Sequence, residues 1–288
     1  MHVPMVLMYH AIAEPCSALE AGYTTPAHEF AQQMAWLAEW GYVGIDVATL
    51  ERNRREGRPL PERSVVITFD DGYTCLHDVA WPILERHGFG ATVFMIADKL
   101  GGTNDHDADH GLVPRRLLDA DQIRSLLARG LDLGSHTATH PDLLALDASA
   151  LEREIAGSRR MLRETFGVPV DAFAYPRGRF DRQVRDAVAA AGYRWAFSTI
   201  AGRNADLDDP LLVRRAQLGS GHDRAEFEAK VRHGDRPLRL ARAALGRRVR
   251  SLRARLRGED PMDSMVSHGQ PAPARAAAPA SFNDTSPS

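Results

Sequence analysis

SVVITFDDGY, residues 64–73, joins a run of apolar and β-branched residues to two adjacent carboxylates and a glycine. The run predicts a buried strand, and Asp70 and Asp71 stand at its end, where a barrel of parallel strands builds its active site. Two neighbouring carboxylates both stay ionised only beside a positive group, and a divalent metal ion meets that need. One carboxylate then binds the metal while the other faces its water, unless the stretch is a plain Asp-Asp-Gly turn.

Strand and helix patterns alternate on both sides of this stretch, which predicts a parallel sheet with helical crossovers. Seven or eight such units favour a barrel over an open sheet. The polar, glycine-rich residues 98–115 predict a long loop near the site. The predicted strands are Val3–Met8, Tyr42–Asp46, Ser64–Phe69, Ala91–Ile96, Leu131–Gly134, Ala172–Ala174, Trp195–Ser198 and Leu212–Ala216. The predicted helices are His28–Trp40, Asp78–His87, Asp119–Arg129, Ala148–Phe166, Asp181–Ala191 and Arg224–Val231.

The composition is that of an ordinary globular enzyme. With 288 residues, 44% of them apolar, the chain can bury the core of one large α/β domain. Its net charge of −2 creates no field that would attract nucleic acid, so no nucleic-acid partner is expected. The two cysteines, Cys16 and Cys75, form no metal-binding framework. The N-terminus resembles no secretory leader, and no apolar run is long enough to span a membrane, which together predict a cytoplasmic protein.

LDLGSHTATHP, residues 131–141, is a second apolar run that ends in polar residues. The spacing of His136 and His140 predicts two imidazoles on one side of a helical turn, as in other two-histidine zinc sites. Two histidines and one aspartate leave a metal ion with open positions for water and substrate, which is typical of a catalytic site. The alternative is a pair of surface histidines that cap a helix.

Two further predicted strands end in polar groups. DAFAYPRGRFD, residues 171–181, contains a turn at Tyr175 to Gly178 whose backbone N–H groups can face a substrate oxygen, although a plain turn has the same sequence. The opening strand ends at His10. A lone histidine is more often structural, but four polar strand ends at one edge of the barrel favour a catalytic role.

These motifs resemble those of the polysaccharide deacetylases of carbohydrate esterase family 4, the NodB-homology group. TFDDG (68–72), SHTATHP (135–141) and AYPRG (174–178) are similar to the family's first three motifs, in that order. LMYHAI (7–12) and PAHEFAQQMAWLAEWGY (26–42) look like the branch that includes biofilm poly-N-acetylglucosamine deacetylases. The resemblance spans about residues 3–232. It implies an α/β fold, a distorted (β/α) barrel of about seven strands, and a hydrolase of exopolysaccharide or cell-surface glycan metabolism.

The resemblance also implies roles for the four central residues. Asp70 corresponds to the family's general base, and Asp71 corresponds to a metal ligand. His136 and His140 complete the ligand set for one divalent metal ion. Zn²⁺ is the expected metal, with Co²⁺ and Ni²⁺ as alternatives.

The chain departs from the family pattern on the substrate side of the site. The backbone N–H at the position of Arg177 binds the oxyanion in the family, next to Tyr175, but the family usually has an aromatic residue where this chain has Arg177. Where many members have an arginine that clamps the catalytic aspartate, this chain has Ala174. The late Leu-x-His motif that supplies a general acid has no clear match. His222 is one candidate, but the branch with the early Tyr-His pair uses that histidine instead, which favours His10.

The predicted reaction is the hydrolysis of an N-acetyl group on an amino-sugar glycan, which yields acetate and a free amine. A metal-activated water attacks the acetyl carbonyl, an aspartate takes its proton and an acid protonates the leaving amine. Three alternatives stay open: an O-acetyl esterase, an amidohydrolase acting on a substrate other than a sugar, and a degenerate member that only binds glycan.

Two C-terminal segments follow a catalytic domain predicted over residues 1–234. Residues 235–258 include Leu238–Arg257, which carries eight arginines and an apolar stripe at helical spacing. Such a helix either docks on the anionic inner face of a membrane, near lipid-linked or nascent glycan, or packs on the barrel. Residues 259–288 are rich in Ala, Pro and Ser and predict a disordered tail. No sequence feature indicates the oligomeric state.

Overall fold

The computed structural model describes residues 3–106, 111–204, 209–235, 241, 244–246 and 250–251. Most of the predicted basic helix Leu238–Arg257 and all of the predicted tail 259–288 lie outside the described residues, so both stay predictions. Within the described part of the chain, every helix is too short or too polar to cross a lipid bilayer.

Eight strands form one sheet, and the pairings between its strands in the described residues are all parallel. The strands are β1 (Met5–Tyr9), β4 (Val43–Ile45), β5 (Ser64–Phe69), β6 (Thr92–Met95), β7 (Asp132–Ser135), β8 (Ala172–Ala174), β9 (Trp195–Phe197) and β10 (Ala216–Gln217). Their order is β10-β1-β5-β6-β7-β8-β9, and β4 pairs with β5 beside this path. A separate two-stranded sheet pairs β2 (Ala11–Ile12) with β3 (Thr24–Thr25).

The segment around residues 213–217 brings the two edges of the sheet together. Val213 forms a parallel bridge with Phe197 of β9, and three residues later Ala216 pairs with Leu7 of β1. The predicted strand Leu212–Ala216 is therefore divided between the two edges, because consecutive parts of it face different neighbours. The sheet curls into the predicted distorted barrel, which confirms the fold class.

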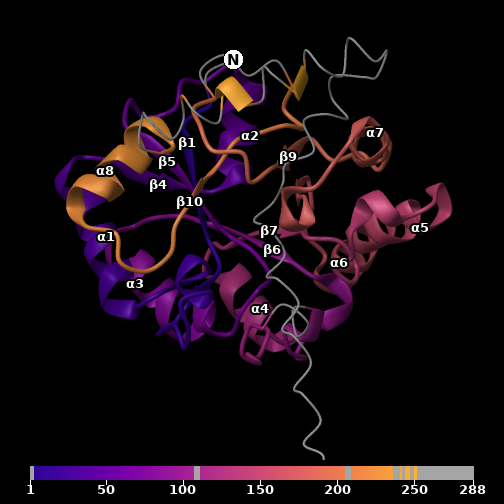
Figure 1. Ribbon diagram of the computed structural model, residues 1–288, viewed down its shortest axis with the longest axis horizontal. Helices are drawn as coiled ribbons and strands as arrows, with labels where there is room; N and C mark the ends of the chain where they lie inside the picture. The colour runs from indigo at the N-terminus through magenta and orange to yellow at the C-terminus, as the bar shows by residue number, and fades with distance from the viewer. Residues whose placement is uncertain are drawn as a thin grey trace, which may run out of the picture.

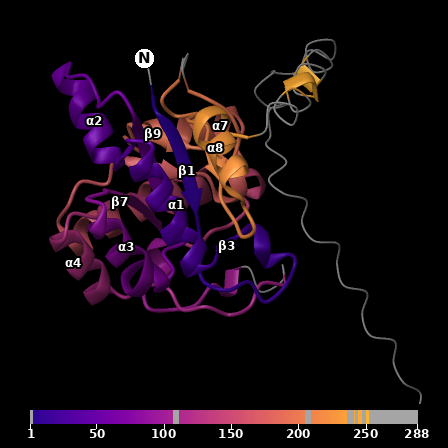
Figure 2. The same ribbon diagram turned by 90° about the vertical axis from the view of Figure 1, so that its left-hand side faces the viewer.

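Helices surround this sheet on its outer face, as Figures 1 and 2 show, except α2, whose buried Val47 and Leu50 pack with the apolar cluster inside the barrel. The helices are α1 (Ala27–Glu39), α2 (Val47–Glu56), α3 (Trp81–Arg86), α4 (Ala120–Ala128), α5 (Ala148–Glu152), α6 (Ser158–Phe166), α7 (Arg182–Ala190) and α8 (Arg224–His233). A π-helical turn, Arg153–Gly157, joins α5 to α6, so the predicted helix Ala148–Phe166 is continuous but irregular. α8 packs against both β1 and α1, which ties the end of the described domain to its beginning.

α2 is the one numbered α-helix of the described residues that the sequence pattern did not predict. Its composition is dominated by charged residues, and it buries little beyond Val47 and Leu50. It begins at a good cap, because the side chain of Asp46 accepts a hydrogen bond from the backbone N–H of Thr49. Gly57 ends it in the left-handed conformation. Caps, more than an apolar stripe, define this helix.

The core has two parts because successive side chains of a strand point to opposite faces. The outer face of the sheet packs against the helices in one large apolar cluster. A smaller cluster fills the inside of the barrel and includes Val66, Phe94, Trp195 and Phe197. The barrel interior is thus solid, and a polar site has to lie above it, at the carboxyl ends of the strands.

Candidate active site

The two adjacent aspartates lie in a tight turn directly after β5. The backbone N–H of Asp70 donates to the Tyr9 carbonyl, so Asp70 continues the β1–β5 pairing, whereas Asp71 turns away with a φ of 68°. Gly72 follows at a φ of 79°, and a Cβ at this position would lie 2.1 Å from the sulfur of Met95. Only glycine fits there, and this glycine lets the two carboxylates leave the strand in different directions.

The second motif does not form the helical turn that its spacing predicted. Residues 136–140 are an irregular loop after β7, and both Thr137 (φ 71°) and His140 (φ 67°) adopt left-handed conformations. The Thr137 hydroxyl oxygen accepts from the backbone N–H of His140. Glu154 holds the middle of the loop, because its carboxylate accepts from the backbone N–H groups of Ala138 and Thr139. The two imidazoles converge through this loop and not through helical periodicity.

The ring of His136 is oriented by a hydrogen bond to the neighbouring strand. Its Nδ1 lies 2.7 Å from the Ala174 carbonyl oxygen, which can only accept, so Nδ1 carries the proton. Its Nε2 then presents a lone pair and lies 3.5 Å from Oδ1 of Asp71. Burial, only partly offset by the charge of Asp70, lowers the pKa of His136 to about 4. A neutral imidazole with its second nitrogen held by a carbonyl is the form in which histidine binds metal.

Asp71, His136 and His140 together fit a divalent metal ion. The Nε2 atom of His140 lies 3.8 Å from Oδ1 of Asp71. Zinc bound at about 2.0–2.1 Å separates neighbouring tetrahedral ligand atoms by roughly 3.4 Å, close to both histidine–aspartate distances. Burial and the neighbouring histidines also lower the pKa of His140 well below its ordinary value. The donors are buried, neutral where they must be and convergent on one carboxylate oxygen, so they match the chemistry of a metal centre.

A further histidine, His106, reaches the same centre from the predicted long loop. Ligand atoms of Asp71, His106 and His140 all lie within 4.8 Å of one another. Its ring centroid is 4.5 Å from that of His140. The loop was predicted to lie near the site, but no residue of it was singled out, because a histidine in a polar stretch has no local signal of its own.

Asp70 is held by an arginine that sequence reasoning missed. Arg215 donates from Nη1 and Nη2 to the two carboxylate oxygens of Asp70, both at 2.7 Å, and its Nε donates to the Ser198 carbonyl. Its side chain is fully buried, and its guanidinium lies over the ring of Phe94, inside the barrel. Burial raises the pKa of Asp70, but the charge and hydrogen bonds of Arg215 hold it below its ordinary value. Arg215 thus clamps Asp70, a role that Ala174 cannot fill at the position where many family members have an arginine.

The two candidate acids lie in different surroundings. His10 follows β1, and its Nε2 is 4.0 Å from Oδ2 of Asp70. Its ring meets Tyr23 edge to face at 5.4 Å between centroids. His222 lies before α8, where its Nδ1 is 3.8 Å from a carboxylate oxygen of Glu226. The geometry brings His10 to the aspartate pair and associates His222 with α8.

Tyr175 and Arg177, the two residues predicted on the substrate side, also lie in different surroundings. The hydroxyl of Tyr175 donates to the Leu211 carbonyl, its backbone N–H donates to the Phe197 carbonyl, and its side chain is fully buried. Tyr175 is therefore a core residue, which corrects the prediction that it faces substrate. Arg177 adopts a φ of 54° in the turn Pro176–Gly178, and its guanidinium donates to the backbone carbonyl of His106 at 3.3 Å.

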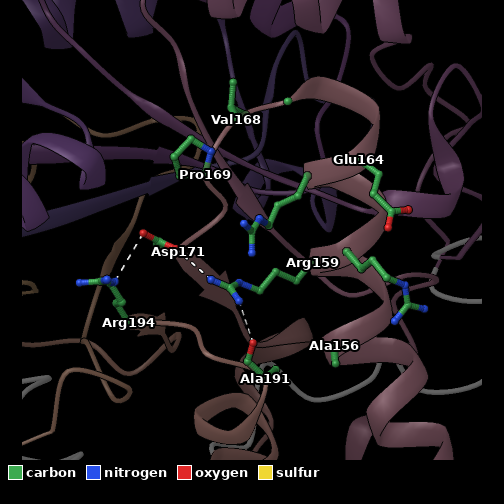
Figure 3. A pocket seen from close by; sticks show the side chains of 11 residues that line it. Ala156, Arg159, Glu164, Val168, Pro169, Asp171, Ala191 and Arg194 are labelled. Atoms are coloured by element: carbon green, nitrogen blue, oxygen red, sulfur yellow. Dashed lines mark hydrogen bonds and ion pairs between the residues drawn. The ribbon is translucent and has the colours of Figure 1, made fainter.

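A cavity of about 800 Å³ lies far from this chemistry in the fold, at the amino-terminal ends of β8 and β9 (Figure 3). Asp171 directly precedes β8 and accepts a hydrogen bond from Arg159 at 3.0 Å. Arg194 directly precedes β9 and lies 3.6 Å from the other carboxylate oxygen of Asp171. None of the predicted site residues lines this cavity.

Comparison with known proteins agrees with the motifs and the fold. Residues 57–196 match the family model for polysaccharide deacetylase, a range that includes Asp70 and the three candidate metal ligands Asp71, His136 and His140. Over these residues the chain is similar to polysaccharide deacetylases. His10 and Arg215 lie outside the matched range, so the base clamp and the early histidine rest on the geometry of this chain.

The chain is also similar to bacterial proteins named as deacetylases. The chain is 26% identical over 226 residues to the provisionally named polysaccharide deacetylase YxkH of Bacillus subtilis, covering 78% of this chain and 75% of that protein. It is 26% identical over 185 residues to the poly-beta-1,6-N-acetyl-D-glucosamine N-deacetylase of Staphylococcus epidermidis, covering 61% of each chain. The solved structure of the Streptococcus pyogenes deacetylase PplD shares the fold, with a TM-score of 0.67, 23% identity, and coverage of 82% of this chain and 100% of that one.

Proposed function

We propose that this protein is a metal-dependent deacetylase that removes N-acetyl groups from an N-acetylglucosamine glycan of an exopolysaccharide or cell surface. The observation that carries the proposal is the pairing of two different carboxylates at one strand end. Asp70 is clamped by Arg215 and kept ionised, while Asp71 converges with two neutral histidines. Hydrolysis of an amide needs both a base and an electrophilic metal, and this arrangement provides a place for each.

Asp71, His136 and His140 would hold the metal, for which Zn²⁺ is the first choice because its sites combine imidazole and carboxylate ligands. When bound, such a metal lowers the pKa of water towards neutrality and polarises a carbonyl group. The chain supports the ligands from behind, because the Ala174 carbonyl fixes the tautomer of His136. Glu154 fixes the loop that carries His140.

Asp70 acts as the general base in this proposal. Both of its oxygens accept hydrogen bonds from Arg215, so the carboxylate cannot rotate away from the neighbouring centre. Arg215 is a positioning residue, because it reaches the reaction only through Asp70. Its buried guanidinium is also the counter-charge that keeps a dehydrated aspartate ionised.

His10 acts as the general acid, and the turn at Arg177 receives the oxyanion. An amine leaves an amide only with a proton, and His10 lies at the end of β1, the neighbour of β5, with its Nε2 4.0 Å from Oδ2 of Asp70. The left-handed backbone of Arg177 directs the turn that follows β8 at the same edge of the barrel. Its backbone N–H would donate to the developing negative charge on the acetyl oxygen.

The substrate class is inferred from relatives. The S. epidermidis relative is named for poly-beta-1,6-N-acetyl-D-glucosamine, and it matches 61% of this chain. An N-acetylated, β-1,6-linked glucosamine oligomer is therefore the first substrate to test.

The test is release of acetate from β-1,6-linked N-acetylglucosamine oligomers by chelator-treated protein, before and after one equivalent of Zn²⁺ is added back. We expect release that returns with zinc and is lost in Asp70→Asn. O-acetylated xylan is assayed in parallel. Faster release from the ester would assign the site to an O-acetyl esterase, and stoichiometric zinc without acetate from any glycan would make the chain a binding protein.

A further inference from the structure

His106 is a loop residue whose side chain lies close to the candidate metal centre. One of its ring nitrogens, one carboxylate oxygen of Asp71 and one ring nitrogen of His140 all lie within 4.8 Å of one another. His106 belongs to the connection between β6 and α4, which leaves the sheet at the same edge as the aspartate turn. Three loops therefore bring donor atoms to one point, and they follow three different strands.

The stem of this loop is held firmly. Asn104 is buried, its side-chain amide donates to the Val113 carbonyl, and its side-chain oxygen accepts from the backbone N–H of Arg115. One residue further, Asp105 pairs with Lys99 at 2.5 Å. Hydrogen bonds thus join the two sides of the loop stem just before His106.

The backbone of His106 is held as well. The guanidinium of Arg177 donates to its carbonyl oxygen at 3.3 Å, from the turn that follows β8. This contact gives a structural use to an arginine where the family usually has an aromatic side chain. It places the imidazole of His106 against that of His140, at 4.5 Å between ring centroids.

We propose that His106 is a fourth protein ligand of the metal, in addition to Asp71, His136 and His140. Neighbouring ligand atoms of a tetrahedral zinc ion are roughly 3.4 Å apart, so a cluster whose atoms lie within 4.8 Å of one another has to contract by up to about 1.4 Å when the metal binds. The inference rests on the proposed function, because it needs the metal centre of that proposal.

A fourth protein donor changes the character of the centre. Sites with three protein ligands keep one tetrahedral position open, whereas four close it. With His106 bound, water and the acetyl group gain access only by an increase in coordination number or by exchange with this imidazole. The loop stem and Arg177 then set how tightly the metal is held in the absence of glycan.

Metal affinity is the first test. Zinc dissociation constants are measured by chelator competition for the full chain, His106→Ala and the control His28→Ala, whose side chain is 76% exposed. We expect His106→Ala to bind one zinc about 10–100-fold more weakly, in the range found when groups that support metal ligands are removed. We expect His28→Ala to match the wild type.

Cobalt spectra give a direct readout of contact. His106→Cys and His28→Cys are loaded with one equivalent of Co²⁺, which resembles zinc in its coordination. A thiolate-to-cobalt charge-transfer band above the wild-type spectrum is expected in His106→Cys alone. His106→Ala should also change the visible cobalt bands, because the coordination number changes.

The outcomes separate the two proposals. If the wild type binds no zinc or cobalt, the metal-dependent function itself is wrong. If it binds one equivalent while His106→Ala keeps the wild-type affinity and cobalt spectrum and His106→Cys shows no new band, the centre stands and the assignment of His106 is overturned.

Discussion

The two ends of the barrel strands use the same chemical pair in opposite ways. At the carboxyl ends, Arg215 and Asp70 form a bidentate pair with side-chain exposures of 0% and 2%. At the amino ends, Asp171 meets Arg159 and Arg194, but the three side chains are 34%, 18% and 48% exposed. The Arg215–Asp70 pair is shielded from solvent, whereas the cluster of Asp171, Arg159 and Arg194 is open to the cavity of Figure 3.

The difference shows why an ion pair alone does not mark a function. Water screens the charges at the amino ends, so these contacts hold helices and strand starts in place at little net gain. Inside the barrel, the removal of either partner leaves an uncompensated charge without solvent. A buried carboxylate that stays ionised is a costly group, and its cost is explained by a task that needs a fixed base.

The largest effect is expected for Asp70→Asn. The variant keeps one side-chain oxygen for Arg215 but loses the base, so kcat should fall by about 10²–10⁴-fold. Zinc content, measured by atomic absorption, should stay at the wild-type level because Asp71 is untouched. If Asp70→Asn loses zinc while Asp71→Asn keeps it, the roles of the two aspartates are reversed.

Arg215→Ala tests the buried pair itself. It leaves Asp70 buried without its counter-charge, and we expect a loss of about 3–5 kcal/mol in the free energy of unfolding, measured by denaturant titration. Because Arg215 holds the pKa of Asp70 down, its removal raises that pKa, and the acid limb of the kcat/KM profile should move to higher pH. Arg215→Lys should restore part of both. An unmoved acid limb in a folded variant would reduce Arg215 to a structural residue.

His10→Ala separates the two candidate acids. Without a proton donor for the leaving amine, turnover should fall by about 10²-fold or more, and one limb of the pH profile should flatten. His222→Ala is the matched histidine variant, and it should keep the wild-type profile because His222 pairs with Glu226 at α8. The opposite pattern would return the role to the late histidine.

Asp132 lies at the amino-terminal ends of the strands and has no role in the proposed reaction. It therefore tests what burial alone costs in stability. It begins β7, and burial, with the nearby charge of Asp46, raises its pKa from 3.8 to about 6. A raised pKa in the folded state means that stability is fully present below about pH 4 and is lost as the pH rises through 6. Asp132→Asn should remove this dependence and increase the free energy of unfolding at pH 7 by on the order of 1–3 kcal/mol. A variant that is less stable than the wild type at pH 7 would contradict this account.

The smallest effect is expected for Arg194→Ala. Its guanidinium is half exposed and bridges Asp171 and Glu51, so thermal unfolding should report a loss of less than about 1 kcal/mol. Acetate release should not change. A loss of activity in a folded Arg194→Ala protein would show that the amino-end cavity contributes to the reaction.

The sequence predicted the parts of the site that are encoded locally. Asp70 and His136 each follow a short apolar run, and that run together with the turn residues after it identifies the strand end without any knowledge of the fold. The barrel followed from the alternation of such runs with amphipathic segments. Boundaries and short helices such as α2 were missed where caps and not apolar stripes define them.

The rest of the site depends on contacts between distant residues. Arg215 lies 145 positions after Asp70, and its neighbour Arg214 has the same local context, so nothing in the chain indicates which arginine is buried. The one signal was an arginine pair inside the predicted strand Leu212–Ala216. The helical turn at 136–140 was wrong because left-handed residues at Thr137 and His140 cannot be foreseen from spacing.

The left-handed backbone of four residues has a consequence for heat tolerance. Asp71, Thr137, His140 and Arg177 are not glycines, yet all have φ values between 54° and 71°. Each such conformation costs about 1 kcal/mol or more, against a net stability of about 5–15 kcal/mol for a typical domain. The reactive edge therefore limits the melting temperature of the whole molecule. A selection for thermostability that ignored turnover would favour glycine at these four positions. The resulting protein would be more stable to heat and less active.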